Sequence, residues 1–541
     1  MKYRIVIYLI SLALFSSTSW GAQKFYDDDP ITKEVDSQNA ANVQEWDIDL
    51  VYDLAENLFT KPGDKTPNVR AQNVNTIDEV PDSSWYTNRS GLTPADVAKG
   101  PDTTNGPAAG KWLVVAGKND GVTPGFTIED TAGKKWFIKP DPPNYPAMST
   151  GTEVVVTKLF WALGYYEPET HIATLSVDNV EISDKATVKA PSGKRRKMKM
   201  SDVNDMLRRA QKNADGTYRV IASLALPGKP LGGFRFYNTR PDDPNDVIPH
   251  EHHRELRGYF VFAAWLNHVD CKAINSLDTL ITEDGKAFVR HNLLDFSSAL
   301  GSGSIYPHEY WESFEQIVEK GSHIAKDAVS FGLVVEPYRT APFFKSRAIG
   351  RIPTDNANWD PDTWLPRATN AAFVRARLDD KFWAARKVMG ISNEMIQAAV
   401  KSGQFNDEAS EQALVSFLAN RRDAIGRKYF TAINPIVNPV LDDNGKLTFG
   451  NAAVEAGFAK APQSYQATWF RFDNNTSQAS QIGGTNASEA RIQAPSGLKD
   501  GYIKVDISAK SAEYPAWETP VHAYFKRAGG GWKLVGFERM E

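Results

Sequence analysis

A short segment near the middle of the chain concentrates side chains that can do chemistry. Residues 268–275 read H-V-D-C-K-A-I-N, so Lys272 lies two and Asn275 five residues after Asp270; further on comes Asp295, in D-F-S. A carboxylate can orient or deprotonate a hydroxyl group, and carboxylate and amide oxygens are ligands for Mg²⁺. Such a set suits phosphoryl transfer, in which the protein mainly positions groups and balances charge.

A lysine and a glutamate earlier in the chain extend this set. Lys139 ends a short β-rich run, and Glu153 lies at the start of a helical pattern of apolar residues. Thr150 and Glu153 also fit a capping box at that helix start, which is an alternative role for the glutamate. The loop upstream of Lys139 contains three glycines: Gly117, Gly121 and Gly125.

In this order, the motifs resemble the catalytic core of the protein-kinase-like superfamily. There, H-R-D-x-K-x-x-N is followed by a hairpin and D-F-G, and an upstream strand lysine pairs with a glutamate of the next helix. The resemblance covers about residues 111–435 and implies ATP with Mg²⁺ or Mn²⁺ as cofactors. By resemblance, the site consists of the catalytic residues Asp270 and Lys272, the metal ligands Asn275 and Asp295, and the nucleotide-binding residues Lys139, Glu153, Gly117, Gly121 and Gly125.

The chain departs from the family pattern at several positions. Val269 replaces the arginine of H-R-D, so control through a phosphorylated activation loop is not expected. Ser297 replaces the glycine of D-F-G, the glycine loop is not G-x-G-x-x-G, and no clear A-P-E motif follows. These differences favour an atypical branch of the superfamily over the eukaryotic protein kinases.

The elements around these motifs follow from the spacing of apolar residues. Three antiparallel strands are expected before and at Lys139, then the helix with Glu153, then two more strands at 171–177 and 218–226. A short helix capped by Ser201 should lie between those two strands, and a hairpin should separate Asn275 from Asp295. Five further helices are predicted at 253–267, 311–325, 371–388, 393–402 and 408–431.

These elements predict an α+β fold in four parts. They are a signal peptide at 1–21, an N-terminal arm at 22–106, a protein-kinase-like domain at 107–435 and a C-terminal all-β module at 440–541. The kinase-like part is expected to be bilobal, with a β-rich N-lobe and a helical C-lobe. The last part alternates apolar and polar residues between Gly-rich turns, which is typical of a small sandwich or barrel.

The first residues indicate export to the periplasm or the extracellular space. Lys2 and Arg4 precede an apolar run at 5–15 that is too short to span a bilayer, and Ser19 and Gly21 suit cleavage before Ala22. The 541 residues contain one cysteine, so no intramolecular disulfide is expected. The formal charge of −4 argues against nucleic acid as a partner. We expect a nucleotide and an unidentified acceptor as partners and no stable membrane insertion; the sequence leaves the oligomeric state open.

Three alternatives stay open at this point, together with one expectation for a basic segment. The kinase-like part could be a non-catalytic binding fold, since nucleoside triphosphates are scarce outside the cytoplasm. The histidine-rich segment 250–253 could hold zinc, although it lacks the H-E-x-x-H spacing. A basic run at 194–199 is expected to be a solvated turn. Finally, the C-terminal module could bind carbohydrate through Trp469, Trp517 and Trp532.

Overall fold

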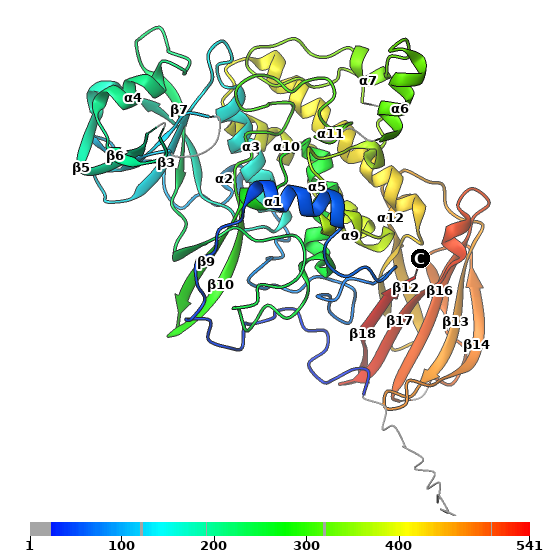
Figure 1. The fold of residues 1–541 in the computed structure, drawn as a ribbon. Coiled ribbons are helices and arrows are strands. Elements are labelled where there is room, and N and C mark those ends of the chain that lie inside the picture. Colours follow the sequence, from blue (N-terminus) through cyan, green and yellow to red (C-terminus); the bar gives the residue numbers. More distant parts are fainter. Residues whose placement is uncertain are drawn as a thin grey trace, which may run out of the picture.

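Helices and sheets alternate along the described chain, which gives a mixed α+β architecture (Figure 1). The computed structural model describes residues 23–118, 123–190, 192–317, 321–356, 358–498 and 500–540. The predicted signal peptide lies outside the described residues. Within them, no helix is both long and apolar enough to cross a bilayer.

A seven-stranded sheet carries Lys139. Its order is β4-β7-β3-β2-β1-β5-β6, with β1 and β5 parallel. The three antiparallel strands predicted up to Lys139 are confirmed as β1, β2 and β3. Helix α3 (Met148–Leu163) packs against β3, β4 and β7 of this sheet. The strands are β1 (Trp112–Gly117), β2 (Phe126–Glu129), β3 (Lys135–Pro140), β4 (Thr170–Leu175), β5 (Val180–Lys189), β6 (Arg195–Lys197) and β7 (Tyr218–Leu224).

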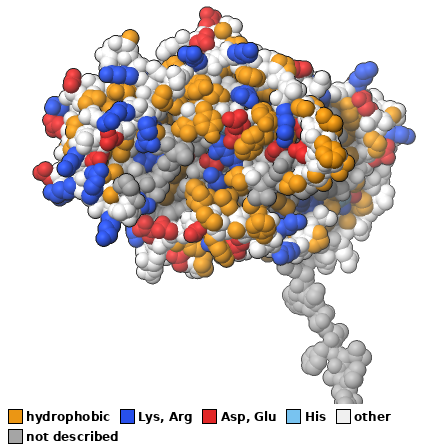
Figure 2. Space-filling view, turned by 45° about the horizontal axis from the view of Figure 1, so that its top comes forward, with side chains coloured by type: hydrophobic (Ala, Val, Ile, Leu, Met, Phe, Trp, Pro, Cys, Tyr) orange, Lys and Arg blue, Asp and Glu red, His pale blue; other side chains and the backbone are white. Residues whose placement is uncertain are grey.

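The basic run differs from its prediction, because part of it is an edge strand. Strand β6 pairs with β5, and the Arg196 guanidinium donates to both carboxylate oxygens of Asp202 at 2.6 and 2.8 Å. The following α4 (Met200–Leu207) is capped from Lys199, not from Ser201, because the Asp202 carboxylate accepts the Lys199 N–H. At this end of the molecule, Lys and Arg are mixed with Asp and Glu (Figure 2).

A three-stranded sheet, β10-β9-β8, positions Asn275 and Asp295. Ser276 pairs with Leu293 at the open end of the β9–β10 hairpin, and the Leu294 N–H donates to the Asn275 carbonyl at 2.9 Å. The predicted hairpin is therefore confirmed, and it brings the two predicted metal ligands to one edge. The strands are β8 (Lys229–Gly232), β9 (Ser276–Glu283) and β10 (Lys286–Leu293).

The main helices lie on both sides of the β9–β10 hairpin, between residues 254 and 432. The prediction of one helix at 371–388 is wrong, because α9 begins anew at Leu378: Arg377 is extended, and its N–H donates to the Asp380 carboxylate. That carboxylate is fixed by Arg254 and Arg257, so tertiary ion pairs set the break. The helices are α5 (Arg254–Leu266), α8 (Ala371–Val374), α9 (Leu378–Met389), α10 (Asn393–Ser402) and α11 (Glu408–Ala432).

The prediction of a helix at 311–325 is also wrong for its first part. Residues 311–317 form turns, with Ser313 in the left-handed region at φ 81°. Arg367 imposes this path, since its guanidinium binds Glu312 at 2.7 Å and its carbonyl accepts the Ile317 N–H at 2.6 Å. Helix α6 spans Gly321–Ser330 and α7 spans Pro337–Thr340.

The C-terminal strands pack on the helices and on the N-terminal segment. One core cluster runs without a break from α5 and α11 to Trp469 and Trp517. Phe25 packs on Phe472 and Tyr524, so the first described residues lie beside the last sheet (Figure 1). The sheets and remaining helices are β11 (Ile436–Leu441), β12 (Lys446–Asn451), β13 (Ser464–Phe472), β14 (Ala479–Ala487), β15 (Arg491–Gln493), β16 (Tyr502–Lys510), β17 (Val521–Ala528), β18 (Gly531–Arg539), α1 (Leu50–Ala55), α2 (Pro94–Lys99) and α12 (Ala452–Glu455).

Candidate active site

Five of the predicted site residues, Gly117 among them, meet around one cavity of about 460 Å³. Its walls come from the seven-stranded sheet, α3 and the β9–β10 hairpin. Lys139, Glu153, Asn275 and Asp295 supply polar groups. The rest of the wall is largely apolar, from Ala116, Phe126, Phe137, Ile138, Pro168, Leu224, Leu226, Ile274, Leu277 and Leu294. A mostly apolar cavity with a few convergent polar groups is typical of a small-molecule site.

Lys139 is the central charge of the cavity. Alternation along β3 buries Trp136 and Ile138 in the core and places Lys139 on the opposite face. Its Nζ lies 3.1 Å from Asp295 Oδ1 and 4.0 Å from Glu153 Oε2. Burial lowers the pKa of Lys139, but the two carboxylates outweigh burial and raise it above its ordinary value. The lysine is therefore held as a cation.

Glu153 lies inside the site and takes no part in a helix cap. Helix α3 begins at Met148, and its first N–H groups are capped by Asp141, which accepts from Ser149 and Thr150. The alternative of a capping box between Thr150 and Glu153 is therefore wrong. Burial raises the pKa of Glu153 above its ordinary value, although Lys139 and the N–H of Phe296 act in the opposite direction. Glu153 thus joins α3 to both the lysine and the D-F-S segment.

Asp295 is presented by an unusual backbone conformation. Its φ of 58° is left-handed, a region that is uncommon for residues other than glycine and in which aspartate and asparagine occur more often than most. The Ser297 hydroxyl donates to Asp295 Oδ1 at 2.9 Å, and Phe296 stacks on Phe160 of α3 with ring centres 4.8 Å apart. Burial raises the pKa of Asp295, but Lys139 and Lys118 outweigh it and hold that pKa below its ordinary value.

The H-x-D-x-K-x-x-N segment folds into a loop held by its own side chains. The Lys272 ammonium lies 2.7 Å from Asp270 Oδ1, and the Asn275 amide donates to Asp270 Oδ2 at 3.0 Å. His268 is fully buried, and its Nδ1 lies 3.3 Å from the Ser298 carbonyl. Burial lowers the pKa of His268 to about 4, so the ring is neutral near pH 7. Its role is to tie this loop to the D-F-S segment.

Sequence reasoning missed two cations at the site. Lys118, which follows β1, lines the cavity, and Arg367 Nη1 lies 3.8 Å from Asp270 Oδ1. The Arg367 N–H also donates to the Val269 carbonyl at 2.8 Å. Lys118 directly follows Gly117 in the sequence, so its position in the predicted glycine loop could have marked it as a site residue. Nothing near Arg367 in the sequence marks it, because only folding brings it to Asp270.

The three glycines of the predicted loop differ in their position relative to the cavity. Gly117 ends β1 and lines the cavity, whereas Gly121 lies outside the described residues. Gly125 packs on β3, where an added Cβ would lie 2.6 Å from the Ile138 carbonyl oxygen. That distance is too short for any other residue without a shift of the backbone, so Gly125 allows the loop to approach the strand that carries Lys139.

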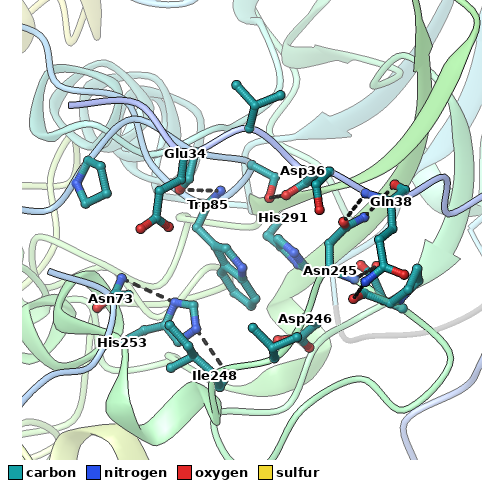
Figure 3. A pocket seen from close by; sticks show the side chains of 18 of the residues that line it. Glu34, Asp36, Gln38, Asn73, Trp85, Asn245, Asp246, Ile248, His253 and His291 are labelled. Atoms are coloured by element: carbon teal, nitrogen blue, oxygen red, sulfur yellow. Dashed lines mark hydrogen bonds between the residues drawn. The ribbon is translucent and has the colours of Figure 1, made fainter. Parts of the chain in front are cut away.

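The histidine-rich segment lies beside a second cavity of about 420 Å³ (Figure 3). His253 Nδ1 lies 3.0 Å from Glu255 Oε1, and its Nε2 lies 3.2 Å from the Ile248 carbonyl. His250 hydrogen-bonds with Asp246 at 2.7 Å and with a backbone carbonyl. On another wall, Trp85 stacks on His291 at 3.4 Å. The described residues hold no group of three or more histidine, cysteine or acidic side chains arranged for a metal.

The tryptophans of the C-terminal sheets do not form a binding platform. Trp469 and Trp517 are fully buried, and Trp532 packs partly buried against the same core. The alternative of carbohydrate binding through these rings is therefore wrong for the first two. Their side chains stabilise the contact between sheet and helices.

Comparisons with known proteins give no match by sequence and distant matches by structure. No protein-family model matches it, and no curated protein matches it. Among solved structures, the Helicobacter pylori proinflammatory kinase CtkA matches with a TM-score of 0.29 and 13% identity, over 56% of this chain and 94% of that chain. The Golgi casein kinase matches with a TM-score of 0.31 and 12% identity, over 73% of this chain and 94% of that one. The same kinase with Mn/ADP bound gives 0.29 and 12%, over 73% and 95%. Since TM-scores of this size do not establish a shared fold, function has to be derived from the site.

Proposed function

We propose that this chain is an exported, kinase-like phosphotransferase that moves a phosphoryl group from ATP to an acceptor. The observation that carries the proposal is the meeting of Lys139, Glu153 and Asp295. They come from β3, α3 and the segment after β10, and all face one cavity with an apolar wall. In this proposal the seven-stranded sheet belongs to a β-rich N-lobe, and the helices from α5 to α11 form the C-lobe.

The cavity has one part suited to a base and one suited to phosphates. Apolar side chains such as Leu224, Leu277 and Leu294 offer a surface for a flat nucleobase. Lys139 is buried, held cationic and aimed at the same space, as a phosphate-binding lysine must be. Glu153 keeps that lysine in place. Gly117 lines the cavity beside Lys118, and the space of its missing side chain is taken by Val188, which would lie 2.8 Å from an added Cβ.

The oxygen donors at the cavity fit a divalent cation. The Asn275 amide nitrogen donates to Asp270, which leaves the amide oxygen as a ligand, and Asp295 is held ionised. Carboxylate and amide oxygens are the ligands that Mg²⁺ prefers. When bound, the metal would neutralise charge on the phosphates. Asp295 and Asn275 would hold it there.

Asp270 is the proposed group that acts on the acceptor. Lys272 and Asn275 fix its carboxylate from two sides, and Arg367 adds a third contact. A fixed carboxylate can accept the proton of an attacking hydroxyl or orient that hydroxyl. Lys272 would neutralise charge on the transferring group.

A non-catalytic nucleotide-binding protein is the second candidate. It is favoured by one observation: both oxygens of Asp270 are engaged within the loop, by Lys272 and Asn275. Binding of nucleotide is common to the two candidates. Only the phosphotransferase should transfer phosphate from ATP, so a transfer assay distinguishes the two candidates.

Titration of the mature protein with ATP in the presence of Mg²⁺ or Mn²⁺ tests the proposal. We expect metal-dependent binding by calorimetry and transfer of labelled γ-phosphate to the protein itself, to water or to an added acceptor. Binding without transfer would favour the second candidate. Absence of binding with either metal would contradict both.

Export remains part of the proposal and rests on the charged start and apolar run before Ala22. Mass spectrometry of the exported fraction should find a mature protein that begins near Ala22. An intact Met1 in a membrane pellet would contradict it.

A further inference from the structure

A small cavity of about 60 Å³ lies behind the proposed catalytic loop, away from the nucleotide cavity. Its walls join the end of α5 at Asn267, α11 at Arg421, and the loops that carry His308 and Arg351. Acidic groups on the wall are Glu309, which is exposed, and Glu312, which is bound by Arg367 at 2.7 Å. None of the residues assigned above to the nucleotide or the acceptor lines this cavity.

Arg421 is a buried cation without an acidic partner in the described chain. The residue is 1% exposed. Its Nη1 donates to the Ala264 carbonyl at 2.6 Å, and its guanidinium lies 4.1 Å from the ring centre of Trp359. Its Nε is buried and has no hydrogen-bond partner among the described residues. Burial lowers the pKa of Arg421 to about 9, and no carboxylate counters that shift. The side chain nevertheless stays charged near pH 7.

His308 and Arg351 present further unsatisfied groups on the same wall. His308 is 2% exposed, and within the described ranges neither ring nitrogen has a hydrogen-bond partner. The nearest carboxylate oxygen of Glu312 lies 3.9 Å from Nε2, which is too far for a hydrogen bond. The Arg351 Nε is likewise buried without a partner in the described chain, while its guanidinium lies over Phe343 at 4.7 Å.

Unsatisfied buried donors are rare in native proteins, and a group of them on one cavity calls for a ligand. A cavity needs about 10–15 Å³ to hold one water, so 60 Å³ leaves room for a larger species. Water would satisfy the donors but would leave the buried charge of Arg421 uncompensated, whereas an anion does both.

We propose that this cavity binds a small oxyanion, with the size and chemistry of inorganic phosphate, through Arg421, Arg351 and His308. The guanidinium groups supply the charge and the directed N–H donors, and the His308 ring supplies a further N–H. This site does not depend on the proposed phosphotransferase activity. It lies next to the catalytic loop, because Asn267 directly precedes His268 and Glu312 is bound by the same Arg367 that contacts Asp270.

Calorimetric titration of the full chain with sodium phosphate, against sodium chloride at matched ionic strength, tests the site. The wild type should bind one phosphate per chain. Arg421→Met should weaken that binding by at least about tenfold, the usual loss for a charge-assisted hydrogen bond to a buried site. Arg351→Met should weaken it in the same direction and serves as the test if Arg421→Met does not fold.

Two variants serve as matched controls. Arg422→Met changes the next residue of α11, whose guanidinium is bound to Asp423 at 2.8 Å, and should keep wild-type affinity for phosphate. Lys135→Met changes an exposed lysine of β3 that belongs to neither cavity and should also keep it. No phosphate binding by the wild type would overturn the site. So would unchanged affinity in folded Arg421→Met and Arg351→Met, or loss of binding in Lys135→Met.

Discussion

Two cavities of similar size, one around Lys139 and one around Trp85, hold their charged side chains in different ways. Around Trp85, the histidines are bound on both sides by neighbours: His250 by Asp246 and a carbonyl, and His253 by Glu255 and the Ile248 carbonyl. Figure 3 shows the contact between His253 and Ile248. Around Lys139, one lysine is shared by two carboxylates from different elements. The Glu153 Oε2 there is buried and makes no hydrogen bond within the described chain.

The difference shows how structural charges can be told from functional ones. Around Trp85, the histidine ring nitrogens are used for contacts within the protein, so they mainly fix the loops that they join, although Asp246 Oδ1 is buried without a hydrogen-bond partner in the described chain. In the Lys139 cavity, the charged groups of Lys139, Glu153 and Asp295 face open space, where a bound ligand can pair with them. Buried charges that are only partly compensated are costly, and they persist where a bound ligand uses them.

The largest effect should come from Asp270. Asp270→Ala should lower turnover by about 10²–10⁴-fold, the usual loss for an acid–base group, and should leave ATP affinity nearly unchanged. The reason is that the proposed role of Asp270 is on the acceptor: its carboxylate is held by Lys272 and Asn275 and does not line the nucleotide cavity. A phosphate-transfer assay paired with calorimetry measures both quantities. Asp284→Ala, in the exposed turn of the hairpin, is the control. Equal turnover in wild type and Asp270→Ala would remove Asp270 from the mechanism.

The next effect should come from Asp295. Asp295→Ala removes the main anionic ligand of the proposed metal site, so the metal-dependent part of ATP binding should disappear. Binding in the presence of a chelator should change much less. Titrations with and without Mn²⁺ compare the two. If Mn²⁺ still strengthens ATP binding to Asp295→Ala as much as to wild type, the metal is held elsewhere.

A smaller effect, on stability alone, is expected in the Trp85 cavity. Burial opposes ionisation of Asp246 and His250, but their mutual charge and hydrogen bond outweigh it, so the pKa of Asp246 is lowered from 3.8 and that of His250 is raised from 6.5. The carboxylate therefore stabilises the fold above about pH 4 and loses that contribution as the pH falls through its folded pKa. The imidazolium stabilises below about pH 6.5 and loses its contribution as the pH rises through its folded pKa.

Asp246→Asn should accordingly cost about 2 kcal/mol of unfolding free energy near pH 5 and less near pH 9. Thermal unfolding at the two pH values measures this. ATP affinity should not change, which separates this cavity from the one around Lys139. A variant that folds normally and loses ATP binding would break the comparison.

Local sequence predicted those parts of the fold that local rules decide. The spacing from Asp270 to Asn275 and the hairpin before Asp295 were predictable, because turn residues and alternating apolar residues specify a hairpin. Helix α10 follows its apolar period from end to end. Lys139 was predictable as the end of a strand, since alternation decides which face it occupies.

Other parts depend on contacts between distant segments. The turns at 311–317 follow a helical pattern of apolar residues, yet Arg367 holds them in another path. The break before α9 likewise depends on Arg254 and Arg257. Arg367 itself reaches Asp270 only after folding, and the buried donors around Arg421 can be recognised only once their lack of partners is visible.

Calorimetric titration of ATP with Mn²⁺ into Lys139→Met and into Lys135→Met tests the central claim most directly. The two lysines lie on the same face of β3, but Lys135 is exposed and Lys139 lies between Glu153 and Asp295. We predict that Lys135→Met binds ATP as the wild type does and that Lys139→Met loses at least about tenfold in affinity, as expected for a lost charge-assisted contact in a buried site. Equal affinity of the two variants would contradict the assignment of this cavity to a nucleotide.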